Sequence, residues 1–185
     1  MFEHLIRTIE KEDEHIGTGV LGGKVIFRVL SENGRSDLAY HMITRPDFPS
    51  YGNWIVRGAT TLWESFFDEK DGMIQSLNHH FWGDVSAWFY YYPGGLRFNP
   101  TSRDIHHVDV KPHFLEALEH AKATHLTKDG EIAISWRREG DMIELNILVP
   151  EIYHGSIELP EGYEFEDGDG FKELKAGIYR IKKKL

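Results

Sequence analysis

The sequence feature that most constrains the fold is a change of hydrophobic periodicity about halfway along the 185 residues. Before this point, apolar residues recur at helical spacing. After about residue 100 they form short, alternating, strand-like runs. The break is Pro93-Gly94-Gly95, because proline lacks a backbone N–H and glycine weakens regular structure. Helices followed by strands favour two packed modules over an alternating βαβ fold. We therefore expect an α+β chain with a helical domain over 1–97 and a strand-rich domain over 98–185.

The helical part is punctuated by glycine and proline. The segment 46–58, which begins at Pro46, has the composition of a loop. Apolar spacing and start and stop signals predict helices on both sides of it. The predicted helices are 20–33, 36–43, 60 or 61 to about 67, and about 78–91.

The strand-rich part has the rhythm of an antiparallel β-sandwich or jelly roll. Turn pairs such as Asp129-Gly130 and the triplet Glu139-Gly140-Asp141 separate its runs. Residues 113–125 are compatible with either a helix or a strand pair. The predicted strands are 108–110, 131–137, 142–149, 156–159 and 177–182.

Composition excludes several functional classes. The net charge of −9 argues against a surface for nucleic acid or for anionic membranes, because both need clustered positive charge. The absence of cysteine excludes disulfides, thiolate metal sites and cysteine nucleophiles. No run of 18 apolar residues predicts a membrane span, and the N-terminus lacks a signal-peptide pattern. We expect a cytoplasmic protein, or a periplasmic or secreted one if the natural N-terminus lies upstream.

Aromatic residues make up 13% of the chain, and four of the five tryptophans lie between positions 54 and 88. Large rings bury much area in protein cores, and they also form the stacking walls of sugar sites. Composition leaves both interpretations open.

A first candidate for chemistry is Glu64, which follows Trp63 in the string Arg57-Gly58-Ala59-Thr60-Thr61-Leu62-Trp63-Glu64. A carboxylate in the first turn of a helix, beside an indole in a cleft, can act as a general base toward water. The spacing Thr61-x-x-Glu64 is also that of a capping box, in which Glu64 only bonds the start of its own helix.

Two histidine pairs are the next candidates. Adjacent histidines diverge on a helix and face opposite sides of a strand, so neither pair is suited to joint metal ligation. In Asn78-His79-His80, one histidine is either a ligand for a substrate hydroxyl, with Asn78 as N-cap, or a structural residue. We interpret His106-His107 as structural or surface residues, and we expect no cofactor and no metal site.

The region from His15 to Gly95 resembles the C-terminal part of the catalytic domain of glycoside hydrolase family 78, the α-L-rhamnosidases. The string Gly-Ala-Thr-Thr-x-Trp-Glu followed by Asn-His is the most specific part of the resemblance. The motifs are His15-Ile16-Gly17-Thr18-Gly19, Gly34-Arg35-Ser36-Asp37-Leu38-Ala39-Tyr40, Phe48-Pro49-Ser50-Tyr51-Gly52, Gly58-Ala59-Thr60-Thr61-Leu62-Trp63-Glu64 and Ser76-Leu77-Asn78-His79.

The resemblance implies the last hairpins of a six-hairpin (α/α) barrel, followed by the family's C-terminal β-sandwich. It implies that Glu64 is the general base of an inverting hydrolysis and that His79 contacts rhamnose in the −1 subsite. Trp54, Trp63 and Asn78 complete the substrate-binding residues that we expect. The sequence departs from the family at His80, where an aromatic residue is usual, and at Gly22-Gly23.

An inverting glycosidase also needs a general acid, with its carboxyl group about 6.5–9.5 Å from that of the base. In the family this acid lies well upstream, and a closed barrel has twelve helices. We therefore expect a portion of an α-L-rhamnosidase that carries the base but not the acid. Its partners would be an α-L-rhamnoside or another carbohydrate, and either a second copy or another chain that supplies the missing hairpins. A non-catalytic carbohydrate-binding or structural module is the alternative. A β-domain sugar isomerase or cupin-like metal protein, using the histidine pairs, is a third.

Overall fold

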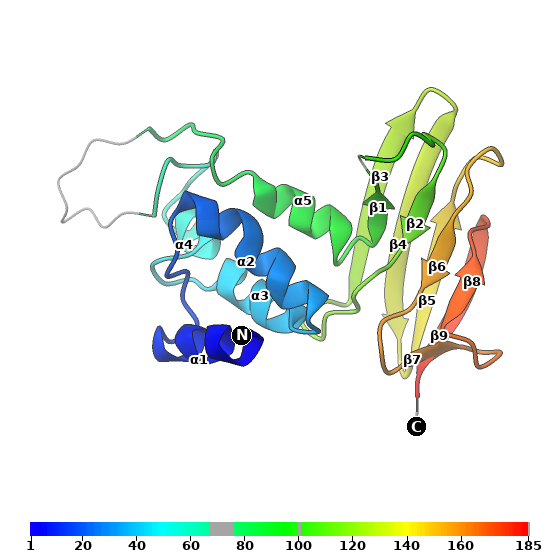
Figure 1. The fold of residues 1–185 in the computed structure, drawn as a ribbon, viewed down its shortest axis with the longest axis horizontal. Helices are drawn as coiled ribbons and strands as arrows, with labels where there is room; N and C mark the ends of the chain where they lie inside the picture. Colours follow the sequence, from blue (N-terminus) through cyan, green and yellow to red (C-terminus); the bar gives the residue numbers. More distant parts are fainter. Residues whose placement is uncertain (67–75, 100, 185) are drawn as a thin grey trace. The chain divides into compact units, whose positions relative to one another are not determined.

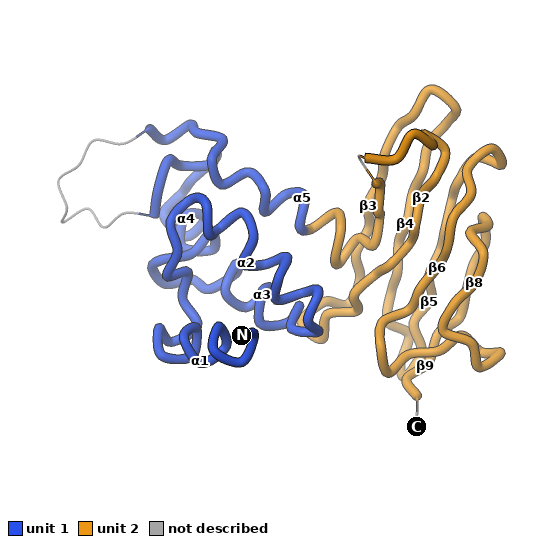
Figure 2. The backbone as a smooth tube through the Cα atoms, in the orientation of Figure 1, with its two compact units in different colours: residues 1–88 blue, residues 89–185 orange. Residues whose placement is uncertain are grey.

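A computed structural model of the protein describes residues 1–66, 76–99 and 101–184. The chain divides into two compact units, residues 1–88 and 89–185 (Figure 2). The division falls within helix α5, a few residues before Pro93-Gly94-Gly95. The change of hydrophobic periodicity predicts a domain boundary at 97/98, just after this triplet. The helical unit and the β unit are described separately below.

The helical unit confirms the helices expected over 20–33 and 36–43, which pack against each other as α2 and α3 (Figure 1). Helix α2 buries Phe27 and Leu30, and helix α3 buries Met42 and Ile43. A helix at the N-terminus was not predicted. The helices are α1 (Phe2–Lys11), α2 (Val20–Glu32), α3 (Ser36–Thr44), α4 (Tyr51–Val56) and α5 (Asp84–Tyr91).

The prediction of a loop over 46–58 is wrong in its second half, because helix α4 forms there. Ser50 is fully buried, and its Oγ accepts a hydrogen bond from the backbone N–H of Asn53 at 2.9 Å. This is an N-cap, and it satisfies one of the backbone donors that the start of a helix leaves unpaired. The cap outweighs the loop-like composition of this short segment.

The prediction of a helix from Thr60 or Thr61 is wrong for the described residues up to 66, because these residues form bends instead. Its expected end at Phe67 lies outside the described residues. The helix expected over 78–91 is shorter than predicted, because α5 begins only at Asp84. In both places the backbone groups bond across to another segment of chain, which local periodicity does not reveal.

The β unit is a sandwich of two sheets, with strand orders β1-β2-β6-β8 and β3-β4-β5-β9-β7 (Figure 1). All pairs are antiparallel except β2 and β6, which pair in parallel at Val110 and Ile157. One apolar core takes residues from both sheets, including Val108 from the first and Trp136 and Leu145 from the second. The strands are β1 (Leu96–Phe98), β2 (Val108–Val110), β3 (His120–Thr127), β4 (Gly130–Glu139), β5 (Met142–Leu148), β6 (Ser156–Glu158), β7 (Tyr163–Phe165), β8 (Phe171–Glu173) and β9 (Gly177–Lys183).

The five strands predicted from the sequence are present as β2, β4, β5, β6 and β9. Residues 113–125 contain neither a helix nor a strand pair, because the segment is irregular until β3 begins at His120. The expected turns join β3 to β4 at Asp129-Gly130 and β4 to β5 at Gly140, whose φ of +62° suits glycine. Among the described helices, none has the length and apolar character that a membrane crossing requires.

Candidate functional site

The structure brings together two segments that carry predicted site residues, 61–64 and 76–79. The backbone N–H of His79 donates to the carbonyl of Leu62 at 2.8 Å, and that of Glu64 donates to the carbonyl of Ser76 at 2.9 Å. The Thr61 hydroxyl donates to the carbonyl of Leu77. Glu64 and His79 are fifteen positions apart in the sequence. They therefore lie on two irregular segments that run next to each other and are joined by backbone hydrogen bonds.

Glu64 is half-buried, and its carboxylate is held by the opposite segment. Its Oε2 accepts a hydrogen bond from the backbone N–H of Ser76 at 2.9 Å. The backbone carbonyl of Glu64 accepts a second bond from the indole N–H of Trp82 at 3.0 Å. The capping-box hypothesis for Thr61 and Glu64 is wrong, because no helix begins there and both side chains bond across to 76–77. The carboxylate is instead fixed in direction by a residue beside the Asn78-His79 motif.

His79 is half-buried, and its imidazole has a defined hydrogen-bonding pattern. The backbone N–H of Phe81 donates to Nδ1 of His79 at 3.2 Å, so the neutral ring carries its proton on Nε2. The ring of His80 is stacked on that of His79, with centroids 5.2 Å apart and planes within 6°. Asn78 is exposed and does not cap α5, because that helix begins six residues later. His79 thus presents a donor nitrogen suited to a hydroxyl oxygen.

Trp54 and Trp63 are part of an aromatic core beside this site. Their exposed fractions are only 3% and 7%. Trp54 stacks on Phe66 with ring centroids 4.4 Å apart and lies 5.9 Å from the Trp63 ring. The indole nitrogen of Trp54 is buried without a hydrogen-bond partner among the described atoms. Both indoles contribute buried area rather than an open stacking face, and direct sugar contact by either remains a prediction.

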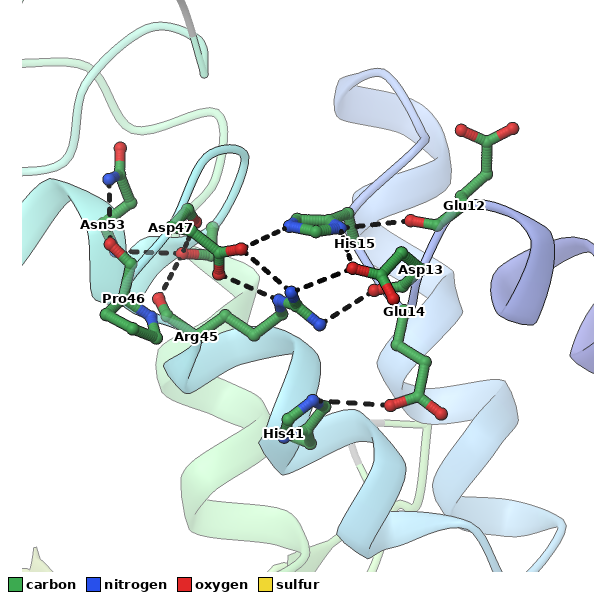
Figure 3. Close-up of polar contacts among 10 residues, drawn as sticks. Glu12, Asp13, Glu14, His15, His41, Arg45, Pro46, Asp47 and Asn53 are labelled. Carbon is green, nitrogen blue, oxygen red and sulfur yellow. Dashed lines mark hydrogen bonds and ion pairs between the residues drawn. The ribbon is translucent and has the colours of Figure 1, made fainter.

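A polar cluster that sequence reasoning missed fixes the turn before α4 (Figure 3). The Arg45 guanidinium donates two hydrogen bonds to the Asp47 carboxylate, both at 2.9 Å, and a third to the carbonyl of Asp13 at 2.8 Å. Nε2 of His15 lies 3.0 Å from Oδ2 of Asp47. The hydrogen bond from Arg45, followed by the one from His15, holds the pKa of the Asp47 carboxyl well below its usual range.

This cluster connects two of the sequence motifs to the aromatic core. It ties the segment 13–15, ahead of α2, to the turn 45–47. Ser50 Oγ donates to the carbonyls of Arg45 and Asp47, and the same oxygen caps α4, the helix that carries Trp54. The only sequence signal for this arrangement was the pair of charged residues that flank Pro46. Their partner, His15, lies 30 residues or more away.

Comparison with known families matches both units. Residues 1–92 match the bacterial α-L-rhamnosidase six-hairpin glycosidase domain, and residues 95–172 match the bacterial α-L-rhamnosidase C-terminal domain. The chain belongs to the bacterial α-L-rhamnosidases. This confirms the resemblance that the motifs between His15 and Gly95 indicated. The two matches occur in the chain order expected for the C-terminal part of such a protein.

Individual rhamnosidases are similar to nearly the whole chain. An α-L-rhamnosidase of Alteromonas sp. (strain LOR) is 30% identical over 96% of this chain, which corresponds to 20% of that protein. The α-L-rhamnosidase structure from Dictyoglumus thermophilum superposes with a TM-score of 0.84 and 26% identity, over 100% of this chain and 23% of that one. The Streptomyces avermitilis α-L-rhamnosidase complexed with L-rhamnose gives a TM-score of 0.80 and 26% identity, over 98% of this chain and 19% of that one. The chain thus spans about one fifth of the length of the curated relatives that it matches.

Proposed function

We propose that this chain supplies the general-base half of an inverting α-L-rhamnosidase site. Glu64 is the base that accepts a proton from the attacking water, and His79 donates a hydrogen bond from Nε2 to a rhamnose hydroxyl. The single observation that carries the proposal is the backbone pairing of segments 61–64 and 76–79, which brings the two motifs next to each other. The relative with L-rhamnose bound supports the choice of sugar.

The arrangement of Glu64 suits a base because its direction is fixed before substrate binds. The Ser76 N–H occupies Oε2, and we assign the proton transfer to Oε1. A preoriented carboxylate avoids the entropic cost of finding the attack geometry during the reaction. Its inverting partner, a carboxylic acid about 6.5–9.5 Å away, would protonate the leaving oxygen. We propose that this acid comes from a hairpin outside residues 1–88, in the same polypeptide or in another chain.

The first test is release of the chromophore from an aryl α-L-rhamnoside, using this 185-residue chain. We expect no turnover from the chain alone and expect turnover when it replaces the matching C-terminal segment of the Dictyoglumus thermophilum enzyme. In that chimera, Glu64→Gln should lower kcat by about 10²–10⁴-fold, the usual contribution of general base catalysis. Glu131→Gln, the same change at an exposed position of β4, is the matched control. Near wild-type turnover of the Glu64→Gln chimera would exclude Glu64 as the base.

The configuration of the first product tests the mechanism. An inverting reaction on an α-L-rhamnoside releases β-L-rhamnose first, which proton NMR distinguishes before the anomers equilibrate. Turnover by the unmodified chain alone, lost in Glu64→Gln, would instead mean that the acid lies within these residues or is supplied by self-association.

The role of His79 is tested by binding rather than by turnover. His79→Ala should weaken L-rhamnose binding by about 1–3 kcal/mol, the usual cost of leaving a polar partner unpaired. Calorimetry on the chimera measures this, with His80→Ala as the neighbouring control. Unchanged affinity in His79→Ala would remove this residue from the subsite.

The β unit offers a second candidate function. A hollow of about 320 Å³ lies on β3, β4 and β5, and is lined in part by Lys122, Arg137, Glu144 and Asn146. Its polar side chains could bind sugar hydroxyls in a non-catalytic module. Saccharide binding that survives His79→Ala but is lost in Asn146→Ala would favour this function.

A further inference from the structure

We propose that Asp104, His107 and His154 form a surface site for a divalent transition metal, with Zn²⁺ as the fitting ion. One ligand atom from each of the three residues lies within 4.8 Å of the other two. The two histidines come from segments far apart in the sequence, the connection before β2 and the connection before β6. This site lies wholly within the β unit and is separate from the segments that carry Glu64 and His79.

The backbone places the two imidazoles on the same face. His107 and His154 form a parallel β-bridge, in which the Val108 N–H donates to the His154 carbonyl at 2.9 Å. Residues paired laterally on neighbouring strands project to the same side of a sheet. The centroids of the two imidazole rings are 5.7 Å apart and the ring planes are nearly perpendicular, so the rings are not stacked on each other.

The carboxylate of Asp104 is already directed at one imidazole. Its Oδ2 lies 2.8 Å from Nε2 of His154, while its Oδ1 accepts the backbone N–H of His106 at 3.1 Å. The second of these bonds fixes the Asp104 side chain relative to the chain that carries His107. All three ligands are therefore oriented by the backbone or by one another.

Asp109 orients His107, as carboxylates outside a metal site commonly orient the histidines that bind the metal. Its Oδ1 accepts hydrogen bonds from both the backbone N–H and the hydroxyl of Ser156, at 3.0 and 2.7 Å. Its Oδ2 lies 3.2 Å from Nε2 of His107. A carboxylate that orients a ligating imidazole is a common supporting feature of metal sites.

The donor set selects the metal. Two imidazoles and one carboxylate match the N and O ligands of zinc, whereas Ca²⁺ and Mg²⁺ prefer oxygen alone. Bonds of about 2.0–2.2 Å in a tetrahedron require ligand atoms about 3.4 Å apart. Oδ2 of Asp104 and Nε2 of His154, now 2.8 Å apart, would separate slightly to admit the ion, and the His107 ligand atom lies within 4.8 Å of the other two. Asp104 and His154 are exposed and His107 is half-exposed, so rotation of the side chains can bring the three atoms to that spacing. Exposure also leaves room for water as a fourth ligand.

His106, the neighbour of His107, is not part of this cluster. Nε2 of His106 lies 3.3 Å from Oδ2 of Asp129. From the sequence alone we expect no metal site, and we depart from that expectation because the fold brings a second histidine beside His107. That residue, His154, lies 47 positions further along the sequence.

The test is titration of the untagged, chelator-treated 185-residue chain with Zn²⁺ by calorimetry and with Co²⁺ by visible absorption. We expect one equivalent to bind, with the intense absorption of tetrahedral cobalt. His107→Ala and His154→Ala should each weaken binding by more than about 10-fold, since loss of even an outer carboxylate costs about 10–100-fold. Asp109→Asn, which removes the outer carboxylate, should weaken Zn²⁺ binding by about 10–100-fold.

His106→Ala and His120→Ala are matched controls, which remove one histidine each from the same unit without touching the cluster. They should bind like the wild type. The exposed positions of the ligands make unfolding of the variants improbable, and circular dichroism checks it. Absence of saturable Zn²⁺ binding, equal loss in the controls, or a preference for Ca²⁺ would overturn the proposal and leave only two histidine–carboxylate contacts, His154 with Asp104 and His107 with Asp109.

Discussion

The two units of this chain build their apolar cores in different ways. In the β unit, both sheets contribute to one core in which Val108, Ile134 and Leu145 have no exposed surface. Large apolar side chains are exposed in both units, among them Leu21 at 83% and Ile55 at 73% on the helices, and Leu126 at 82% and Ile178 at 64% on the sheets. A sandwich closes when its two sheets meet. A helix in a hairpin barrel is covered only when neighbours are present on both sides.

The comparison teaches that the two units obtain order in different ways. The β unit relies on a core shared by residues far apart in the sequence. The helical unit relies on an aromatic cluster around Trp54 and on polar ties such as that between Arg45 and Asp47.

The largest loss of stability should come from removing the indole of Trp136 from the core of the β unit. Trp136 is 2% exposed and donates its indole N–H to the Pro93 carbonyl at 2.7 Å. Trp136→Ala should destabilise the β unit by about 3–5 kcal/mol. Amide hydrogen exchange resolves the two units, and protection should fall in β4 and β5 while α2 and α3 keep theirs.

The corresponding change in the helical unit is Trp82→Ala, at an equally buried indole. Its loss of protection should be confined to residues 1–88. If either substitution lowered protection equally in both units, the two would unfold as one body and the contrast between them would be wrong.

The next effect is a pH dependence confined to the β unit. Burial, followed by the nearby Arg97 guanidinium, lowers the pKa of His113 to about 4. The ring packs against Tyr92, on whose face Arg97 also lies. The unfolded chain takes up this proton near its ordinary pKa of about 6.5, whereas the folded one takes it up only near 4. The contribution of the neutral His113 to the free energy of unfolding is therefore fully present above about pH 6.5. The free energy of unfolding falls by up to roughly 3 kcal/mol as the pH drops toward 4.

Denaturant unfolding of the β unit at several pH values measures this effect. His113→Gln should flatten the profile between those two pKa values, and His125→Gln, at an exposed position of β3, should leave it unchanged. An unaltered slope in His113→Gln would show that other groups cause the acid sensitivity.

A smaller effect tests how closely the helical unit is packed. A Cβ at Gly23 would lie 2.2 Å from the ring of Trp82. Gly→Ala in a helix ordinarily stabilises by about 0.5–1 kcal/mol. Here overpacking, at about 1–3 kcal/mol, should reverse the sign and lower the melting temperature of the helical unit. Leu21→Ala on the same helix should change stability by no more than about 0.5 kcal/mol. Stabilisation by Gly23→Ala would mean that the aromatic cluster is loosely packed.

Local pattern was enough to predict most of the regular structure. Helical periodicity located α2 and α3, and glycine-marked turns located β4, β5 and β9. These elements are long or sharply bounded, so their own residues determine them. The family was also evident from short motifs, because residues such as Trp63-Glu64 and Asn78-His79 stand at specific spacings.

The sequence by itself determined the order of helices and strands, the family and the identity of the candidate residues. The tertiary structure decided which of those residues meet. The helix expected at Thr60–Phe67 is absent up to residue 66 because the Leu62 and Glu64 backbones bond to 76–79 instead. His107 meets His154 only through a strand pairing across 47 positions. Periodicity reports the environment within one element, whereas such pairings depend on chain closure between elements, and no local pattern contains that information.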